Sequence, residues 1–177
     1  MASTSARTST RVLAWLLFGI GQALLLLSVW LFATRFTGPH RGPTVSWVEA
    51  LAIDSALLLL FALQHSGMAR GDFKAWLRGR LPVLLERPVY VVASGIALCG
   101  LMHFWVHPPG VLFDARGTPA LSWGLRGLAA LAGIFTLRAL LETGAGDLTG
   151  LTDAQTGIAE QDRPLRPLRT TGTYAVV

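Results

Sequence analysis

Residues 60–77 read LFALQHSGMARGDFKAWL, and the predicted fold depends on the boundary inside this stretch. An apolar run ends at residue 63, and the polar side chains of Gln64, His65 and Ser66 follow it. The remainder is basic and aromatic, so it can form a short helix with an apolar side in the membrane and basic side chains among the headgroups. The stretch therefore predicts a membrane span that ends at one bilayer surface and continues as an interfacial helix.

Four apolar runs can each cross a hydrocarbon core of about 30 Å at about 1.5 Å per helical residue. We expect an all-α, integral membrane four-helix bundle with spans at about residues 12–33, 46–64, 88–106 and 121–141. The short interfacial helix follows the second span. In the fourth span, Ala129 and Gly133 have a spacing of small residues that lets membrane helices approach closely.

The composition favours a membrane protein over a soluble one. The 177 residues are 52% hydrophobic and 14% charged, with a mean hydropathy of +0.51. Soluble domains have about 25% charged residues. The net charge of +5 lies mostly in loops, where it favours contact with anionic lipid over nucleic acid. Cys99 is the only cysteine, which excludes an intrachain disulfide and a multi-cysteine metal site.

The placement of basic residues predicts the orientation. Four spans put both termini and the loop between the second and third spans on one side of the membrane. That side carries ten basic residues against three on the other, and such an excess indicates the cytoplasmic side. We expect a multi-pass protein of the bacterial inner membrane with both termini cytoplasmic. The ten are Arg7, Arg11, Arg70, Lys74, Arg78, Arg80, Arg87, Arg163, Arg166 and Arg169, and the three are Arg35, Arg41 and Arg116.

Two charged residues fall inside the predicted spans. Asp54 lies about 12 Å and Arg126 about 7 Å below the outer starts of their spans, from the rise of a helix. A carboxylate at the bilayer centre costs about 2.5–3.5 kcal/mol, so a partner is expected. The two residues can form a structural ion pair. A protonated, hydrogen-bonded Asp54 and a functional role are the alternatives.

The histidines do not predict a metal or haem site. His103 and His107 share a helix face, but His65 belongs at the opposite surface, roughly 25 Å away. His40 could join the outer pair, but Pro108 interrupts the helix at His107. Histidines bonded to water or backbone at the interface are the expected state, and we expect no metal. The sequence also lacks a Gly-rich phosphate loop and a GxSxG motif.

The candidate site is the cytoplasmic end of the second span. Gln64, His65 and Ser66 offer hydrogen bonds beside the cations of Arg70 and Lys74, and together they can bind an anionic group or a polar substrate. The alternative is a set of side chains that cap the helix end in the wet interface. Residue types alone assign no catalytic residue.

The same region resembles a known family. Residues 61–70, FALQHSGMAR, with Phe73–Lys74 after them, resemble the methanethiol S-methyltransferase and NnrU-like membrane proteins, which are related to isoprenylcysteine carboxyl methyltransferases. Glu86–Arg87 with Tyr90–Val91 resembles the next block of that family, and Asp54 matches an acidic residue that commonly precedes it. The resemblance covers about residues 52–92.

The resemblance implies a methyltransferase that uses S-adenosylmethionine and acts on a small, methanethiol-like thiol or on an isoprenylcysteine carboxylate. Gln64, His65, Ser66, Arg70 and Lys74 would line the cytoplasmic mouth of the acceptor site. In the family, a Tyr-containing stretch like residues 171–174 leads into an Arg-His-Pro motif and two further spans that bind the cofactor. That motif is absent from this sequence.

We therefore expect the N-terminal region of such an enzyme. Residues 1–141 would form the four-span domain, and residues 142–177 an extended polar cytoplasmic segment that leads to a catalytic part outside this sequence. An oligomer or a partner chain could supply that part. The alternative is a non-catalytic membrane accessory protein of the NnrU type. The expected partners are the lipid bilayer and a small thiol or lipidated substrate, and not nucleic acid.

Overall fold

The computed structural model describes residues 4–37, 45–109, 117–159 and 162–163. Its regular elements within these ranges are α1 (Thr4–Thr37), α2 (Trp47–Ala69), α3 (Gly71–Arg78), the 3-10 turn η1 (Val83–Leu85), α4 (Glu86–Phe104), α5 (Pro119–Thr143), α6 (Ala145–Thr149) and α7 (Leu151–Thr156). Four of these helices, α1, α2, α4 and α5, are long and apolar enough to cross a membrane. The predicted all-α membrane fold is confirmed, with a short helix directly after the second span.

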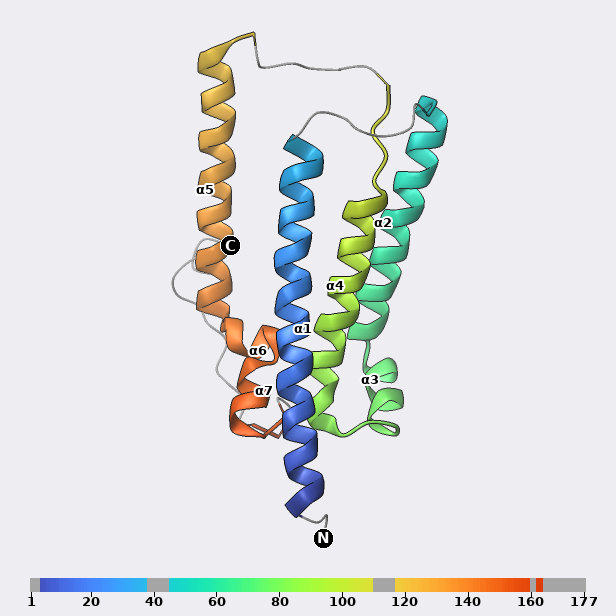
Figure 1. The fold of residues 1–177 in the computed structure, drawn as a ribbon, viewed down its shortest axis with the longest axis vertical. Coiled ribbons are helices and arrows are strands. Elements are labelled where there is room, and N and C mark those ends of the chain that lie inside the picture. Colours follow the sequence, from blue (N-terminus) through green and yellow to red (C-terminus); the bar gives the residue numbers. More distant parts are fainter. Residues whose placement is uncertain (1–3, 38–44, 110–116, 160–161, 164–177) are drawn as a thin grey trace.

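Helix α4 lies between α1 and α2 and packs against both (Figure 1). Two glycines bring α1 and α4 together. A Cβ atom on Gly95 would lie 2.8 Å from Cβ of Leu24, and one on Gly21 would lie 2.9 Å from Cγ1 of Val91. Because real Cβ atoms do not approach so closely, these backbones can lie against each other only where glycine stands.

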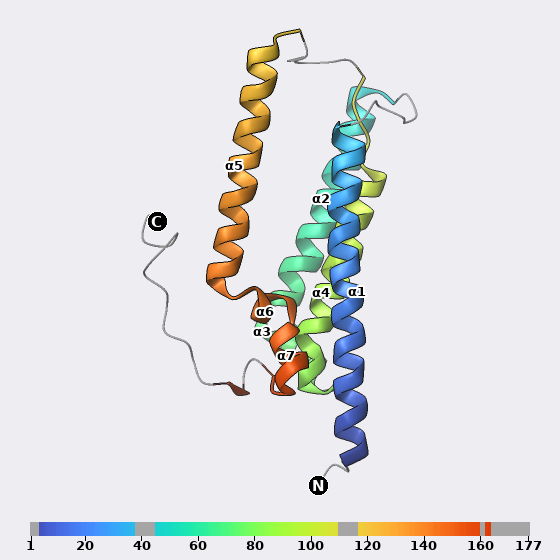
Figure 2. The same ribbon diagram turned by 60° about the vertical axis from the view of Figure 1, so that its left-hand side comes forward.

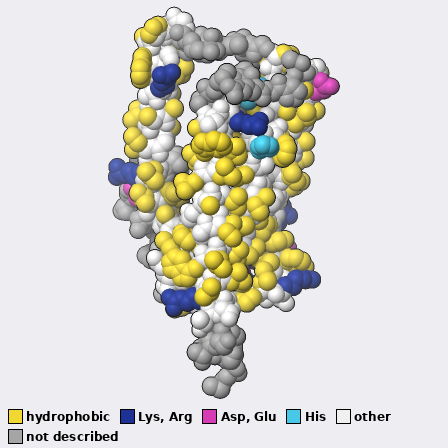
Figure 3. All heavy atoms as spheres, viewed as in Figure 1, with side chains coloured by type: hydrophobic (Ala, Val, Ile, Leu, Met, Phe, Trp, Pro, Cys, Tyr) yellow, Lys and Arg dark blue, Asp and Glu magenta, His cyan; other side chains and the backbone are white. Residues whose placement is uncertain are grey.

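Helix α5 stands apart from the other three spans (Figure 2). None of its residues is buried, and no atom outside its own backbone lies within 4 Å of a Cβ built on Gly133. The expectation that Ala129 and Gly133 mediate a close helix contact is therefore wrong for the described part of the chain. Hydrophobic side chains cover the long helices between their ends (Figure 3), as a lipid environment requires.

Helix α2 begins at a capping box and ends later than predicted. The backbone N–H of Ser46 donates to Oε2 of Glu49 at 2.8 Å, and the N–H of Glu49 donates to Oγ of Ser46 at 3.3 Å. The helix continues to Ala69, so residues 64–66 lie within its last turns and do not cap its end. The extended backbone of Arg70 (φ −69°, ψ 146°) then separates α2 from α3.

Residues 145–156 form two short helices where the sequence analysis expected an extended segment, so that expectation is wrong. Glycines at 144, 150 and 157 have φ of 97°, 82° and 70°, the left-handed conformation that ends helices. Nε of Arg11 in α1 donates to the carbonyl of Ala154 at 3.2 Å, and its Nη2 donates to the carbonyl of Gln155. Arg163 forms ion pairs with Asp147 and Asp153. The bonds from Arg11 hold α7 against α1, and the ion pairs of Arg163 join α6 to α7.

The start of α1, helix α3 and the α6–α7 pair all lie at one end of the molecule (Figure 1). The positions expected to share one membrane side are therefore together, as far as the structure describes them. Residues 164–177, including the Tyr-containing stretch at 171–174, lie outside the described residues.

Candidate functional site

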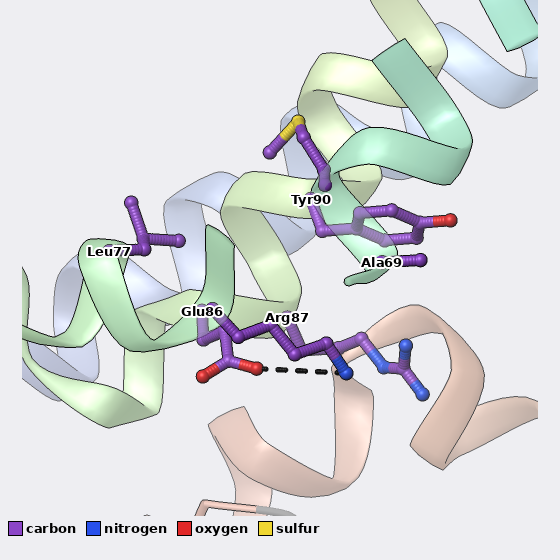
Figure 4. Close-up of a pocket in the computed structure, with 7 residues that line it drawn as sticks. Ala69, Leu77, Glu86, Arg87 and Tyr90 are labelled. Carbon is purple, nitrogen blue, oxygen red and sulfur yellow. Dashed lines mark ion pairs between the residues drawn. The ribbon is translucent and has the colours of Figure 1, made fainter. Parts of the chain in front are cut away.

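A small pocket lies where α2 ends, α3 follows and α4 begins (Figure 4). Its volume is about 60 Å³. Pockets for drug-sized ligands measure about 300–1,000 Å³, so this one accommodates a small group and not a nucleoside. Its walls combine apolar and charged side chains, which are those of Met68, Ala69, Lys74, Leu77, Glu86, Arg87 and Tyr90.

Glu86 joins α3 to the start of α4 on one wall of the pocket. Arg78 donates from Nε to Oε2 of Glu86 at 2.6 Å and from Nη2 to Oε1 at 3.3 Å. This hydrogen bonding raises the pKa of the Arg78 guanidinium, which stays charged at any physiological pH. Nζ of Lys74 lies 3.9 Å from Oε1 of the same carboxylate, the ion pair drawn as a dashed line in Figure 4. Glu86 thereby fixes the ammonium of Lys74 at the pocket.

Arg87 connects the pocket to the short helices. Its Nε donates to the backbone carbonyl of Asp147 in α6 at 3.1 Å. Figure 4 shows its guanidinium on the same side as the hydroxyl of Tyr90. Arg11 in turn bonds to α7. The placement of α6 and α7 therefore influences where the Arg87 cation lies at the pocket. The pocket thus has two cations, Lys74 and Arg87, against one carboxylate.

A polar cluster connects α2 to α4 behind Tyr90. The Tyr90 hydroxyl oxygen lies 3.0 Å from each ring nitrogen of His65, and Oγ of Ser94 lies 3.3 Å from Nδ1 of the same ring. The ring of Phe61 stacks on His65 with 5.4 Å between centroids. These contacts place the imidazole beside Tyr90, next to the pocket.

The five residues predicted to bind substrate are only partly brought together. Lys74 lines the pocket, and His65 reaches it through Tyr90. Nε2 of Gln64 lies 3.0 Å from Sδ of Met68, while its buried Oε1 has no hydrogen-bond partner among the described residues. The side chains of Ser66 and Arg70 are exposed and make no contact with the pocket within the described ranges.

Six lining residues were not among the predicted site residues: Met68, Ala69, Leu77, Glu86, Arg87 and Tyr90. Three of them belong to the ERPVY block, which the sequence analysis used only for the resemblance. Pro82 separates this block from the interfacial helix by a few residues, so the next span must start at the same membrane surface. This short connection is the sequence feature that could have indicated that residues 86–90 lie next to the end of α2.

The intramembrane charges Asp54 and Arg126 do not pair, which corrects the ion pair considered from sequence. Asp54 is 7% exposed, and its Oδ1 accepts the backbone N–H of Val106 at 2.9 Å, just beyond the end of α4. The guanidinium of Arg126 lies 5.2 Å from the ring centroid of Trp123 on its own helix. The pair is not formed because α5 stands apart from α2. Among the described residues, no group of three or more His, Cys, Asp or Glu side chains gathers as a metal site would require.

Comparison with known proteins finds similarity to methyltransferases of methanethiol. A methanethiol S-methyltransferase from Pseudomonas deceptionensis is 47% identical over 68 residues, which are 38% of this chain and 25% of that protein. Methanethiol S-methyltransferase 2 from Bradyrhizobium diazoefficiens is 29% identical over 172 residues, 93% of this chain and 66% of that protein. Nurim from Rattus norvegicus is 41% identical over 80 residues, 44% of this chain and 30% of that protein.

These similarities confirm the resemblance that residues 61–74 suggested. The chain spans about a quarter of the length of the Pseudomonas relatives that it matches. No family model matches this chain. No solved structure matches it.

Proposed function

We propose that the pocket between α2, α3 and α4 is the methyl-acceptor site of a membrane methyltransferase whose donor is S-adenosylmethionine. The observation that carries the proposal is the pocket itself, which is small, partly apolar and lined by two cations. Apart from Leu77, its lining residues come from the two sequence blocks that resemble this kind of enzyme. The similarity to methanethiol S-methyltransferases supports the same assignment.

The acceptor that suits this pocket is a small thiol such as methanethiol. Met68 and Leu77 provide apolar contacts for its alkyl group, while Lys74 and Arg87 favour the thiolate over the thiol. An isoprenylcysteine carboxylate would present its anionic end to the same cations, but its bulk exceeds a pocket of about 60 Å³. The pocket would act by orienting the sulfur and excluding water around it.

The described pocket does not fit S-adenosylmethionine, because its volume of about 60 Å³ is too small for a nucleoside. The residues assigned above are therefore assigned to the acceptor alone. The four candidate spans make the chain an integral membrane protein. We further propose that the pocket faces the cytoplasm of a bacterial inner membrane, because basic residues are concentrated at that end.

The test is binding of ¹³C-labelled methanethiol by the purified chain in lipid nanodiscs, followed by NMR. We expect the wild-type chain to bind methanethiol, and Arg87→Ala and Lys74→Ala to bind it at least ten-fold more weakly. Arg35→Ala is the matched control, because Arg35 lies in the last turn of α1 and outside the pocket lining. A folded chain that binds no methanethiol, or equal affinities in all four proteins, would contradict the proposal.

The similarity to Nurim favours one second candidate, a membrane protein without catalysis that uses the same surface to bind a partner. The two candidates differ in what stabilises the chain. An acceptor site predicts that methanethiol raises the unfolding temperature and that Arg87→Ala removes this effect. A non-catalytic protein predicts no response to methanethiol.

A further inference from the structure

We propose that Tyr90 and His65 form a proton relay that ionises the thiol bound at the pocket. This inference rests on the proposed acceptor function and adds to it the group that receives the proton. From the sequence, His65 is expected only to contact substrate, and Tyr90 belongs to a block that carries the resemblance.

The chemistry requires such a group. A thiolate, and not a thiol, is the nucleophile, and an alkyl thiol with a pKa of about 8.5 or higher is mostly protonated at neutral pH. Glu86 is bonded to Arg78 and paired with Lys74, so its carboxylate is already occupied on the pocket wall. The nearest described imidazole is that of His65, and imidazole is the usual side chain for proton transfer near neutral pH.

The geometry supplies the route. Tyr90 lines the pocket, and its hydroxyl oxygen is 3.0 Å from the His65 ring nitrogens, within the reach needed for proton transfer. When Nδ1 carries the ring proton, it donates to Oγ of Ser94, and Nε2 is the unprotonated nitrogen. Because the Tyr90 oxygen is equidistant from both nitrogens, the imidazole must rotate slightly before the lone pair of Nε2 points at the hydroxyl. The ring of Phe61 stacks beside the imidazole.

The step breaks one S–H bond and changes no oxidation state. The thiol proton passes to the oxygen of Tyr90 while the original Tyr90 proton passes to Nε2 of His65. The products are a thiolate, a neutral Tyr90 and an imidazolium at His65. The guanidinium of Arg87 lies on the same side as the Tyr90 hydroxyl and favours the thiolate (Figure 4). Other described residues leave the side chain of His65 exposed, and in the proposed relay its proton is released at the membrane interface.

The charged groups around this relay are Lys74 on α3 and Glu86 and Arg87 on α4, all of which line the pocket. None of them lies between Tyr90 and His65. Changes confined to the relay should therefore alter thiol ionisation without removing the cations that bind the anion.

The test follows the ionisation of ¹³C-labelled methanethiol by NMR, with the whole chain in nanodiscs of phosphatidylcholine and phosphatidylglycerol. We expect bound methanethiol to ionise at lower pH than the free thiol. Tyr90→Phe and His65→Gln should each raise that midpoint by about one pH unit, a ten-fold change in the ionisation constant. His103→Gln at the opposite end of α4 is the matched control and should change nothing.

The outcomes separate the two proposals. If the wild-type chain binds methanethiol but both relay variants ionise it at the wild-type midpoint, the relay is wrong and the acceptor site stands. If the folded wild-type chain binds no methanethiol, the acceptor proposal fails and the relay fails with it. The two variants test the relay independently, so a folding defect in one leaves the other decisive.

Discussion

At the scale of single residues, Gly95 shows how little room the contact between α1 and α4 leaves. A methyl group there would lie 2.8 Å from Cβ of Leu24, and backbone-proximal atoms cannot move aside easily. We expect Gly95→Ala to lower the free energy of unfolding by about 1–3 kcal/mol, the usual cost of overpacking. Denaturant unfolding in mixed micelles measures it.

Gly100 provides the matched control for this change. It lies on the same helix, and no atom outside the helix backbone lies within 4 Å of a Cβ built there. Gly100→Ala should be neutral or slightly stabilising, because alanine favours helix. Equal losses in the two variants would show that the α1–α4 contact is not the cause.

Asp54 is a second residue whose role is local. Its Oδ1 accepts the N–H of Val106. Val106 lies beyond the end of α4, so this N–H is not part of the helix hydrogen bonding. We expect Asp54→Ala to cost about 1–3 kcal/mol, because a buried N–H is then unsatisfied. Asp54→Asn keeps an acceptor oxygen and should cost clearly less. The same unfolding assay compares them, and equal costs would contradict the hydrogen-bond explanation.

At the scale of elements, α3 is held to α4 chiefly through Glu86. We expect Glu86→Gln to speed hydrogen exchange of the α3 amides, because the ion pairs to Lys74 and Arg78 are lost. The pKa of Arg78 is raised in the folded state, so the arginine contribution is fully present below its unfolded pKa. It is lost only as pH rises through the raised folded value, far above neutrality.

The control for this prediction is Asp72→Asn, which removes an acidic charge in the first turn of the same helix without touching Glu86. Exchange in α3 should then remain near the wild-type rate. If Asp72→Asn accelerates exchange as much as Glu86→Gln does, general charge balance explains the effect.

The α6–α7 pair depends on Gly150 for its conformation and its contact. Gly150 has φ of 82°, and a Cβ there would lie 3.3 Å from the ring of Pro88, which is fully buried. The left-handed backbone costs a residue with a side chain about 1–2 kcal/mol. We expect Gly150→Ala to increase hydrogen exchange in α7, and through Asp147 to loosen Arg87 at the pocket.

Gly127→Ala in α5 is the comparison, since Gly127 has helical φ and nothing within 4 Å of its Cβ position. It should leave exchange in α7 unchanged. Undisturbed α7 exchange in Gly150→Ala would mean that neither the backbone conformation nor the contact with Pro88 is needed.

At the scale of the whole molecule, α3, α6 and α7 lie at one end, and α5 begins at the opposite end (Figure 1). In a Cys99→Ser background, we expect Gly79→Cys and Gln155→Cys to react with an impermeant maleimide from one face of membrane vesicles. Gly117→Cys should react from the other face. Gly79 directly follows α3, and Gln155 lies in α7. Gly117 lies just before the start of α5, at the opposite end of the molecule. Labelling of all three from one face would overturn the topology.

Much of the molecule could be predicted from the sequence, since a bilayer leaves few choices. Backbone groups in hydrocarbon must be hydrogen-bonded within a helix, so apolar length alone determines where the spans form. The break at Pro82 and the basic, aromatic residues before it located the interfacial helix. The same stretch also carried the resemblance to methanethiol S-methyltransferases, because residues 61–74 lie close together in the chain.

The contacts between helices were decided only by the tertiary structure. Glycines in α4 and α5 look alike in the sequence, yet among those described only Gly95 has atoms of another helix within 4 Å of its Cβ position. The glycines of α5 have none because α5 stands apart. The same arrangement left Asp54 with a backbone partner in place of Arg126. The sequence by itself determined which segments enter the membrane and which end carries the polar residues. Which residues share the pocket depends on helix rotation and on distant contacts such as Arg87 with Asp147, which local composition does not encode.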